Sequence, residues 1–425
     1  MASRFSDSSA TSPSPTRMIP GSPISNGGLP MIHRLAIRVP ALLALALASL
    51  LGLSAFPTVA SADETSGRET IADPALRELV ELLESRASKI MPRRRVPGAG
   101  VAILTGGEIA WAGGFGFADV KTERPVTGDT VFNIGSISKT VAAWGLLRLV
   151  EAGKLDLDTP VEKVLTRWKL PPSAFDHDLV TLRRLLSHTA GLSLHGYPGF
   201  QPGEKLPTIE ESLSGATNGP GDVRVILEPG TLWKYSGGGY TISQLLLEEV
   251  SGKAFADFMR EEVLVPLGMT SSDYVWTEEI TRLAATPYDQ RGNAIPGPRF
   301  TALAAAGLQT TPRDLARFAR ASMAPLRRKD DPATWVLKPE TLELMQSSAQ
   351  ASPNYGLGYM ISENRGIRVV GHGGANDGWM ARLDIVPDTG DGLVVLTNGT
   401  NGSDVHQILF QLWVEWLAEK QGHSR

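Results

Sequence analysis

The pattern of apolar and polar residues first becomes regular after residue 70. Asp73-Pro74 has the form of a helix N-cap followed by proline at the first helical position. The apolar residues that follow have the i, i+3, i+4, i+7 spacing of an amphipathic helix: Leu76, Leu79, Val80 and Leu83. Two short apolar runs come next, Ala99–Leu104 and Glu108–Ala112, and Gly106-Gly107 between them predicts a β-hairpin.

Helical periodicity dominates the middle of the chain. The pattern from about Ser136 to Glu151, which stops before Gly153, predicts a long helix. Shorter helical patterns recur at 182–188, 240–250, 254–263, 312–322 and 338–347. Residues 192–223 form a Gly- and Pro-rich stretch that is long enough to suggest a functional loop.

Strand patterns return after about residue 350. The apolar runs there are Leu357–Ser362, Ile367–Val370, Met380–Val386 and Leu393–Thr397, and a helical pattern follows at about 404–419. Short turns rich in Gly and Asn join these strands, so neighbouring strands should be antiparallel.

The expected fold class is therefore α/β (α+β), with one antiparallel sheet built from both ends of the chain. Helices flank the sheet, and a mostly helical region is inserted into it. We expect a single catalytic domain over 63–425, with a sheet part at about 70–135 and 350–425 and a helical part at about 136–349.

Residues 1–62 have a different character. Residues 1–30 are rich in Ser, Pro and Gly, so we expect them either to be disordered or not to be translated, with Met31 as the better start. Met31 begins a basic segment that leads into an apolar run over 39–56 and then into Ala60-Ser61-Ala62, the small residues that a signal peptidase requires. This predicts a signal peptide cleaved after Ala62, and hence a periplasmic or secreted protein without stable membrane insertion. An uncleaved anchor stays open, because a run of about 18 apolar residues is borderline for spanning a bilayer.

Composition excludes several classes of function. The chain has 425 residues, a formal net charge of −4 and no cysteine. This charge offers no basic surface to nucleic acid, and the lack of cysteine excludes disulfides and thiolate chemistry. We found no G-x-S-x-G elbow, P-loop, dinucleotide fingerprint or H-E-x-x-H pair, so we expect neither a metal nor a cofactor. The expected partner is a small-molecule or peptide substrate, and the oligomeric state stays open.

The segment Gly135-Ser136-Ile-Ser-Lys139 carries the first candidate chemistry. Ser136 opens the predicted long helix, where the positive end of the helix dipole favours developing negative charge, and Lys139 lies one turn further on the same face. Burial against the apolar helix would lower the pKa of Lys139, which could then act as a base for Ser136. Taken alone, so short a pattern more often marks an N-cap serine beside a surface lysine.

The surrounding residues reverse that preference. Val131–Thr140 resembles the nucleophile segment of serine β-lactamases and penicillin-binding proteins. Further segments similar to the same family follow in order: Leu185–Leu192, Pro229–Tyr240, Pro266–Met269, Ala305–Leu308, Tyr355–Tyr359 and Gly371–Gly374. Their order and spacing match the class C β-lactamase-like group, which includes DD-peptidases, D-aminopeptidases and esterases. The resemblance covers essentially all of 70–420.

This resemblance implies roles for particular residues. Ser136 would be the nucleophile of an acyl-enzyme mechanism and Lys139 its partner. Tyr235 matches the tyrosine of the family's Y-x-N element, which moves protons between the nucleophile and the leaving group. The backbone N–H groups of Ser136 and Ala375 would form the oxyanion hole.

Two positions depart from the family pattern. His372 stands where the K-T-G element has lysine, and Gly237 stands where the Y-x-N element has asparagine. The two glycines after His372, Gly373 and Gly374, would leave room for the backbone of the substrate along that strand. The two departures weaken a β-lactamase assignment and favour peptidases and esterases. A protonated His372 would bind a carboxylate and a neutral one would bind it poorly, so anion recognition should depend on pH.

Other residues have weaker claims. Asp377 either orients His372 or caps a turn. His188 and His195 would suit a Ser-His-Asp arrangement, but Lys139 already supplies a base, and we expect His188 to hold its loop by hydrogen bonds. Three tryptophans are expected in the core or the cleft wall: Trp144, Trp233 and Trp379.

The sequence therefore predicts an exported serine hydrolase that acts through an acyl-enzyme on small esters or on peptides ending in D-amino acids. A β-lactamase, or a penicillin-binding sensor that acylates and does not deacylate, is the alternative. The intact set of Ser136, Lys139 and Tyr235 argues against an inactive scaffold.

Overall fold

The computed structural model describes residues 71–323 and 336–422, which belong to a unit spanning 65–425. The leader and signal peptide predicted for 1–62 lie outside the described residues. Across the described ranges we find no helix that is both apolar enough and long enough to cross a membrane.

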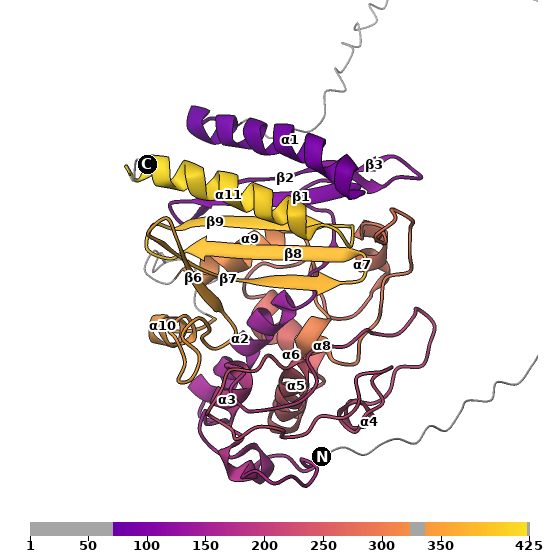
Figure 1. Cartoon of the computed structure of the whole chain (residues 1–425), viewed down its shortest axis with the longest axis vertical. Coiled ribbons are helices and arrows are strands. Elements are labelled where there is room, and N and C mark those ends of the chain that lie inside the picture. Colours follow the sequence, from indigo (N-terminus) through magenta and orange to yellow (C-terminus); the bar gives the residue numbers. More distant parts are fainter. Residues whose placement is uncertain (1–70, 324–335, 423–425) are drawn as a thin grey trace, which may run out of the picture. The chain divides into compact units, whose positions relative to one another are not determined.

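A seven-stranded sheet lies at the centre of this unit (Figure 1). Its strands in chain order are β1 (Gly98–Thr105), β2 (Glu108–Asp119), β3 (Arg124–Pro125), β6 (Met360–Asn364), β7 (Ile367–Asn376), β8 (Trp379–Val386) and β9 (Asp391–Thr397). The order across the sheet is β3-β2-β1-β9-β8-β7-β6, and every neighbouring pair is antiparallel. β1 pairs with β9, for example at Val101 and Val395, so the expected sheet built from both ends of the chain is confirmed.

Both faces of the sheet are covered, which explains why its central strands are apolar at nearly every position. Helices α1 (Pro74–Arg94) and α11 (Ser403–Lys420) pack on one face, where Val101 and Ile103 of β1 join their apolar cluster. The alternate residues of β1, Ala102 and Leu104, belong to the larger cluster on the opposite face.

The segment between β2 and β6 is mostly helical. Its α-helices are α2 (Ile137–Glu151), α3 (Leu182–Leu186), α4 (Ile209–Leu213), α5 (Gly237–Ser251), α6 (Phe255–Met259), α7 (Glu278–Leu283), α8 (Leu303–Ala306), α9 (Pro312–Ser322) and α10 (Pro339–Met345). The described part of this segment also has three helical turns, at Val161–Lys163, His177–Leu179 and Arg260–Leu264, and a small second sheet that joins β4 (Phe132–Asn133) to β5 (Gln309–Thr310).

Local signals set the ends of several elements. The side chain of Asp73 accepts from the Ala75 amide at 2.9 Å, which makes it the N-cap of α1 as expected. Gly106 and Gly107 have φ of +60° and +82°, as a tight hairpin between β1 and β2 requires. The helix expected over 254–263 instead changes from α6 to a π-helical turn at Arg260.

Candidate active site

Ser136 lies at the start of α2, on a turn held by its neighbours. Gly135 has φ of +50°, and its amide donates to Oδ1 of Asn133 at 3.0 Å. The Ser136 hydroxyl makes no capping bond to α2, although the residue is at the N-cap position. Its hydroxyl is therefore available to other groups in the site.

Lys139 supplies the partner of that hydroxyl. Its Nζ lies 3.1 Å from Oγ of Ser136 and 2.7 Å from the carbonyl oxygen of Ala305, a residue of α8. Lys139 is buried, and burial lowers its pKa to about 7. No carboxylate of the described residues pairs with it, so the amine is partly neutral near pH 7 and can accept a proton.

Tyr235 completes this group. Nζ of Lys139 lies 4.9 Å from the centre of the Tyr235 ring. Burial raises the pKa of the Tyr235 phenol, and a hydrogen bond with Ser136 counteracts part of that shift. The phenol is thus neutral at physiological pH and is a proton donor rather than a base. The three residues that the sequence singled out come together in the structure.

The strand β7 packs backbone to backbone against the turn that holds Ser136. A Cβ added at Gly135 would lie 2.6 Å from the Ala375 nitrogen, and one added at Gly374 would lie 1.9 Å from the Ile134 carbonyl oxygen. The same Cβ at Gly374 would lie 3.2 Å from the Ser136 nitrogen. Only glycine fits at these two positions. The turn and the strand therefore approach closely enough for the backbone amides of Ser136 and Ala375 to lie near each other, as an oxyanion hole requires.

Gly373 and Gly374 therefore have different surroundings. Gly374 makes room for the nucleophile turn, whereas the sequence suggested that it makes room for the substrate. A Cβ at Gly373 would meet only the Ala381 carbonyl oxygen, at 4.0 Å, so this position is open.

A pair of asparagines ties β7 to the same turn. Nδ2 of Asn376 donates to Oδ1 of Asn133 at 2.6 Å and lies 3.2 Å from the carbonyl oxygen of Ala306. We did not find this pair from the sequence, because its members are far apart in the chain.

His372 is held by two partners. Its Nδ1 lies 2.5 Å from the Gly373 carbonyl oxygen, and its Nε2 lies 3.0 Å from the hydroxyl of Tyr355. The carbonyl can only accept, so Nδ1 carries the proton and Nε2 accepts from Tyr355. Burial lowers the pKa of His372 to about 4. The imidazole is therefore neutral near pH 7. The protonated His372 that was expected to bind a carboxylate is not populated at that pH.

Asp377 does not orient His372. It lies in the two-residue turn between β7 and β8 and lines a separate hollow with Asp289 and Arg291. Of the two alternatives for Asp377, the turn position is the one the structure has. Tyr355 orients the ring instead; its segment was recognised in the sequence, but its role was not.

Gly237 begins α5 under a neighbouring loop. Its amide donates to the His195 carbonyl oxygen at 2.9 Å, and a Cβ there would lie 3.1 Å from the same oxygen. The loop residues around Tyr197 thus cover the place where a larger side chain would begin. Gly237 itself offers the substrate no side-chain contact.

His188 lies in an aromatic cluster behind Tyr235. Its Nδ1 accepts from the Ser236 amide at 3.1 Å, and its ring centre lies 4.2 Å from that of Tyr235. Its Nε2 is buried and has no hydrogen-bond partner in the described structure. The expectation that His188 holds its loop agrees with the Ser236 contact, and the ring also packs against the candidate proton donor.

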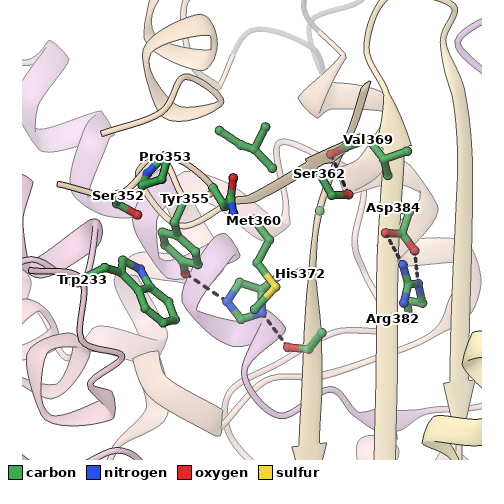
Figure 2. A pocket seen from close by; sticks show the side chains of 14 residues that line it. Trp233, Ser352, Pro353, Tyr355, Met360, Ser362, Val369, His372, Arg382 and Asp384 are labelled. Atoms are coloured by element: carbon green, nitrogen blue, oxygen red, sulfur yellow. Dashed lines mark hydrogen bonds and ion pairs between the residues drawn. The ribbon is translucent and has the colours of Figure 1, made fainter. Parts of the chain in front are cut away.

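A cavity of about 520 Å³ opens beside this group (Figure 2). Trp233, which is 43% exposed, lines it together with Tyr355, Met360 and His372. The other two tryptophans named from the sequence, Trp144 and Trp379, are buried in the core. Within 71–323 and 336–422, no group of three His, Asp or Glu side chains has the arrangement of a metal site.

Comparison with known proteins shows the family. Residues 75–414 match the family model described as Beta-lactamase, so this chain belongs to the β-lactamase family. The chain is a serine hydrolase of that family, and its fold is the β-lactamase/transpeptidase-like fold.

Several curated proteins are similar over much of the chain. Penicillin-binding protein 4 of Amycolatopsis lactamdurans is 28% identical over 354 residues, which cover 80% of this chain and 90% of that protein. Unguisins hydrolase ungD' of Aspergillus campestris is 25% identical over 80% of this chain and 64% of its own length. Esterase EstB of Burkholderia gladioli is 30% identical over 52% of this chain and 57% of its own length.

Solved structures agree with the fold. The octameric penicillin-binding protein homologue from Pyrococcus abyssi superposes with a TM-score of 0.66 at 28% identity, over 81% of this chain and 77% of that one. A β-lactamase/D-alanine carboxypeptidase from Pseudomonas syringae superposes with a TM-score of 0.64 at 19% identity, over 79% of this chain and 99% of that one, which supports the fold alone.

Proposed function

We propose that this chain is an exported serine hydrolase that acts through an acyl-enzyme on small esters or on peptides containing D-amino acids. The proposal depends chiefly on the 3.1 Å contact between Lys139 Nζ and Ser136 Oγ, made by a buried lysine whose pKa is about 7. An amine with that pKa is about half neutral at pH 7 and suits a general base.

The proposed reaction has two halves. The Ser136 oxygen bonds to the substrate carbonyl carbon, its proton passes to neutral Lys139, and the carbonyl electron pair moves onto the oxygen between the amides of Ser136 and Ala375. When the bond to the leaving group breaks, the leaving atom takes the proton of the Tyr235 phenol, and the Lys139 ammonium restores it. Water then attacks the acyl carbon, with Lys139 again taking the proton, and the acid leaves as Ser136 is reprotonated.

The substrate preference rests on His372 and Gly237. A β-lactam needs its carboxylate and side-chain amide held, and a neutral His372 and a glycine supply neither charge nor an amide. Each missing charge-assisted contact costs about 1.5–3 kcal/mol. An ester needs only the nucleophile and the oxyanion donors. Relatives named as an esterase, a hydrolase and a penicillin-binding protein are consistent with acyl transfer of this kind.

A turnover panel tests this proposal. We expect kcat/KM for p-nitrophenyl acetate to exceed that for a chromogenic cephalosporin by about tenfold or more, with a D-Ala-D-Ala peptide as the third substrate. Cephalosporin turnover equal to or above the ester rate would restore β-lactamase as the first choice. Failure to turn over any of the three, together with no labelling by a fluorophosphonate, would overturn the serine-hydrolase assignment of this site.

Export rests on the sequence of residues 31–62. We expect mature protein from the natural host to begin at Asp63, directly after the A-x-A segment. N-terminal sequencing checks this expectation. Protein that retains residues 31–62 would contradict it and favour an anchored form.

A further inference from the structure

The 520 Å³ cavity lies next to the candidate catalytic residues, yet its wall contains none of Ser136, Lys139 and Tyr235. We infer that this cavity binds the leaving group of the substrate, and that the leaving group is bulky, apolar and uncharged. The inference rests on the proposed function and narrows its substrate class.

The first argument concerns the neighbours of Tyr235. The rings of Trp233 and His372 each lie with their centres 6.2 Å from that of Tyr235, and both residues line the cavity. Tyr355 continues the wall, with ring centres 6.0 Å from Trp233 and 5.8 Å from His372. Since Tyr235 gives its proton to the leaving atom, the substituents beyond that atom lie against these rings.

The second argument concerns direction along β7. The oxyanion donor Ala375 lies two residues beyond Gly373, whereas the cavity follows β7 the other way, past Gly371 to Val369. The acyl and leaving groups extend in different directions from the carbonyl carbon. With the oxygen held at Ala375 and the leaving atom at Tyr235, the cavity receives the leaving group.

Gly373 of β7 gives the cavity room. It pairs with Arg382 of β8, and a Cβ at Gly373 would meet nothing closer than 4.0 Å, whereas a Cβ at Gly371 would lie 1.9 Å from the Leu383 carbonyl oxygen of β8. Figure 2 shows the aromatic side chains and His372 on one side of β7 and the Arg382–Asp384 pair beyond it. A branched or aromatic leaving group has room here, since 520 Å³ is within the range of small-molecule pockets.

The third argument concerns charge. Arg382 is the cationic side chain in the wall, and it forms an ion pair with Asp384 through two nitrogens, one of them 3.1 Å from Oδ1. Its guanidinium also lies 3.6 Å from the centre of the Phe410 ring. Both nitrogens of His372 have partners, and Lys234, next to Tyr235 in the chain, does not line the cavity. Among the residues that the structure describes, no unpaired cation lines the cavity, so a leaving group with a free carboxylate would lose hydration here without gaining a counter-ion, which is unfavourable.

Two esters that differ only in the charge of the leaving group test this inference. Both carry an acetyl group; one releases methyl 4-hydroxybenzoate and the other releases 4-hydroxybenzoate. After each kcat/KM is divided by the rate of hydroxide-catalysed hydrolysis, we expect the uncharged ester to be favoured by roughly tenfold or more.

Substitutions at Met360 test whether the preference for the uncharged ester arises in this cavity. Met360 lines the cavity from the edge strand β6 and is 40% exposed, so lysine is tolerated there. Met360→Lys should reduce the preference to about threefold or less, because the ammonium pairs with the carboxylate, whereas Met360→Gln should keep it. Val265→Lys is the matched control, since Val265 is exposed outside the cavity and this change should leave both rates unchanged.

Three outcomes are possible. A tenfold preference that Met360→Lys alone removes supports the inference. Equal or faster turnover of the charged ester by the wild type, or a preference that Met360→Lys leaves intact, overturns it while leaving the proposed function standing. No turnover of either ester, with no fluorophosphonate labelling, overturns the proposed function and the inference with it.

Discussion

The Tyr355 hydroxyl donates to Nε2 of His372 at a distance of 3.0 Å. The Gly373 carbonyl oxygen on the other side of the ring can only accept, so it holds the proton on Nδ1 and leaves Nε2 to accept from Tyr355. Because His372 and Gly373 belong to the strand that meets the Ser136 turn, the orientation of the ring bears on the geometry of the whole cleft.

Removing this hydroxyl should affect catalysis indirectly. Tyr355→Phe leaves Nε2 of His372 buried without a donor, which costs about 1–3 kcal/mol of unfolding free energy and loosens the ring. We expect kcat/KM for p-nitrophenyl acetate to fall by about threefold to tenfold and the ¹⁵N resonance of His372 Nε2 to shift. Tyr288→Phe is the control: it removes a hydroxyl that accepts from the Val120 amide at 2.8 Å, outside the site, and should alter stability without altering the kinetics. Wild-type kinetics and an unshifted His372 resonance in Tyr355→Phe would contradict this role.

The pH dependence of acylation should report Lys139. In the proposed mechanism the neutral form of Lys139 is the base, and burial lowers its pKa to about 7, so kcat/KM should rise about tenfold between pH 6 and 8 and then level off. Lys139→Met should lower the rate steeply and leave no inflection near pH 7. A wild-type profile that is flat across this range would show that Lys139 is not the base.

Stability should depend on the same group. The pKa of Lys139 falls from 10.5 to about 7 on folding, so the unfolded chain binds more protons in between. The penalty of burying the ammonium is absent above pH 10.5, grows as pH falls, and is complete below about pH 7. Lys139→Met should therefore stabilise the protein more at pH 6 than at pH 10, as measured by urea unfolding. A stability difference that does not vary with pH would contradict the shifted pKa.

Covalent labelling tests the nucleophile directly. Ser136→Ala should abolish labelling by a fluorophosphonate and lower kcat by about 10³-fold or more. Lys139→Met and Tyr235→Phe should each lower it steeply, and the double variant should lose less than the product of the two, since both handle one proton. Ser88→Ala, an exposed serine of α1, should label fully. Near-normal turnover by Ser136→Ala would disprove its assignment.

His188 should contribute through packing. His188→Asn keeps an acceptor for the Ser236 amide and tolerates the φ of +59° at this position, but it removes the ring that lies 4.2 Å from Tyr235. We expect kcat to fall by about threefold to tenfold with a small change in stability. His188→Ala should in addition lose about 1–3 kcal/mol, because the Ser236 amide is left unpaired. Ester kinetics with urea unfolding check both variants, and equal stability of the two would contradict the hydrogen-bond argument.

The parts of the fold that the sequence predicts well have local causes. The hairpin at Gly106-Gly107 and the helix over 312–322 depend on turn residues, a Pro at the first helical turn and short-range periodicity. Helices α4, α7 and α8 contain between four and six residues, too few for any apolar period to show. That one sheet contains strands from both ends of the chain followed from the strand patterns there and agrees with the family resemblance, whereas the specific pairing of β1 with β9 was not predicted.

The candidate site likewise has contacts that depend on local sequence and contacts that depend on distant segments. Ser136 and Lys139 are three residues apart on one helix, so their contact was foreseeable. Asp377 is near His372 in sequence, but five residues of strand span roughly 16 Å. The short separation along the chain therefore did not imply a contact between the two side chains. Tyr355 and Asn133 lie in segments that the family resemblance singled out, but their contacts with His372 and Asn376 depend on the packing of distant segments, which no local pattern shows. The lowered pKa of His372 likewise depends on burial, which a sequence position does not reveal.

The pairing of β1 with β9 also sets an order of events during synthesis. The segment carrying Ser136 and Lys139 leaves the ribosome more than two hundred residues before β7 and β9. Until those strands arrive, β1 is paired with β2 but lacks β9 on its other edge, and the Ser136 turn lacks the Ala375 amide. A nascent or truncated chain that ends before β7 therefore holds the proposed nucleophile and base without the proposed oxyanion hole. Contacts of such long sequence separation form late in folding, so hydrolytic activity begins only when the last strands close the sheet.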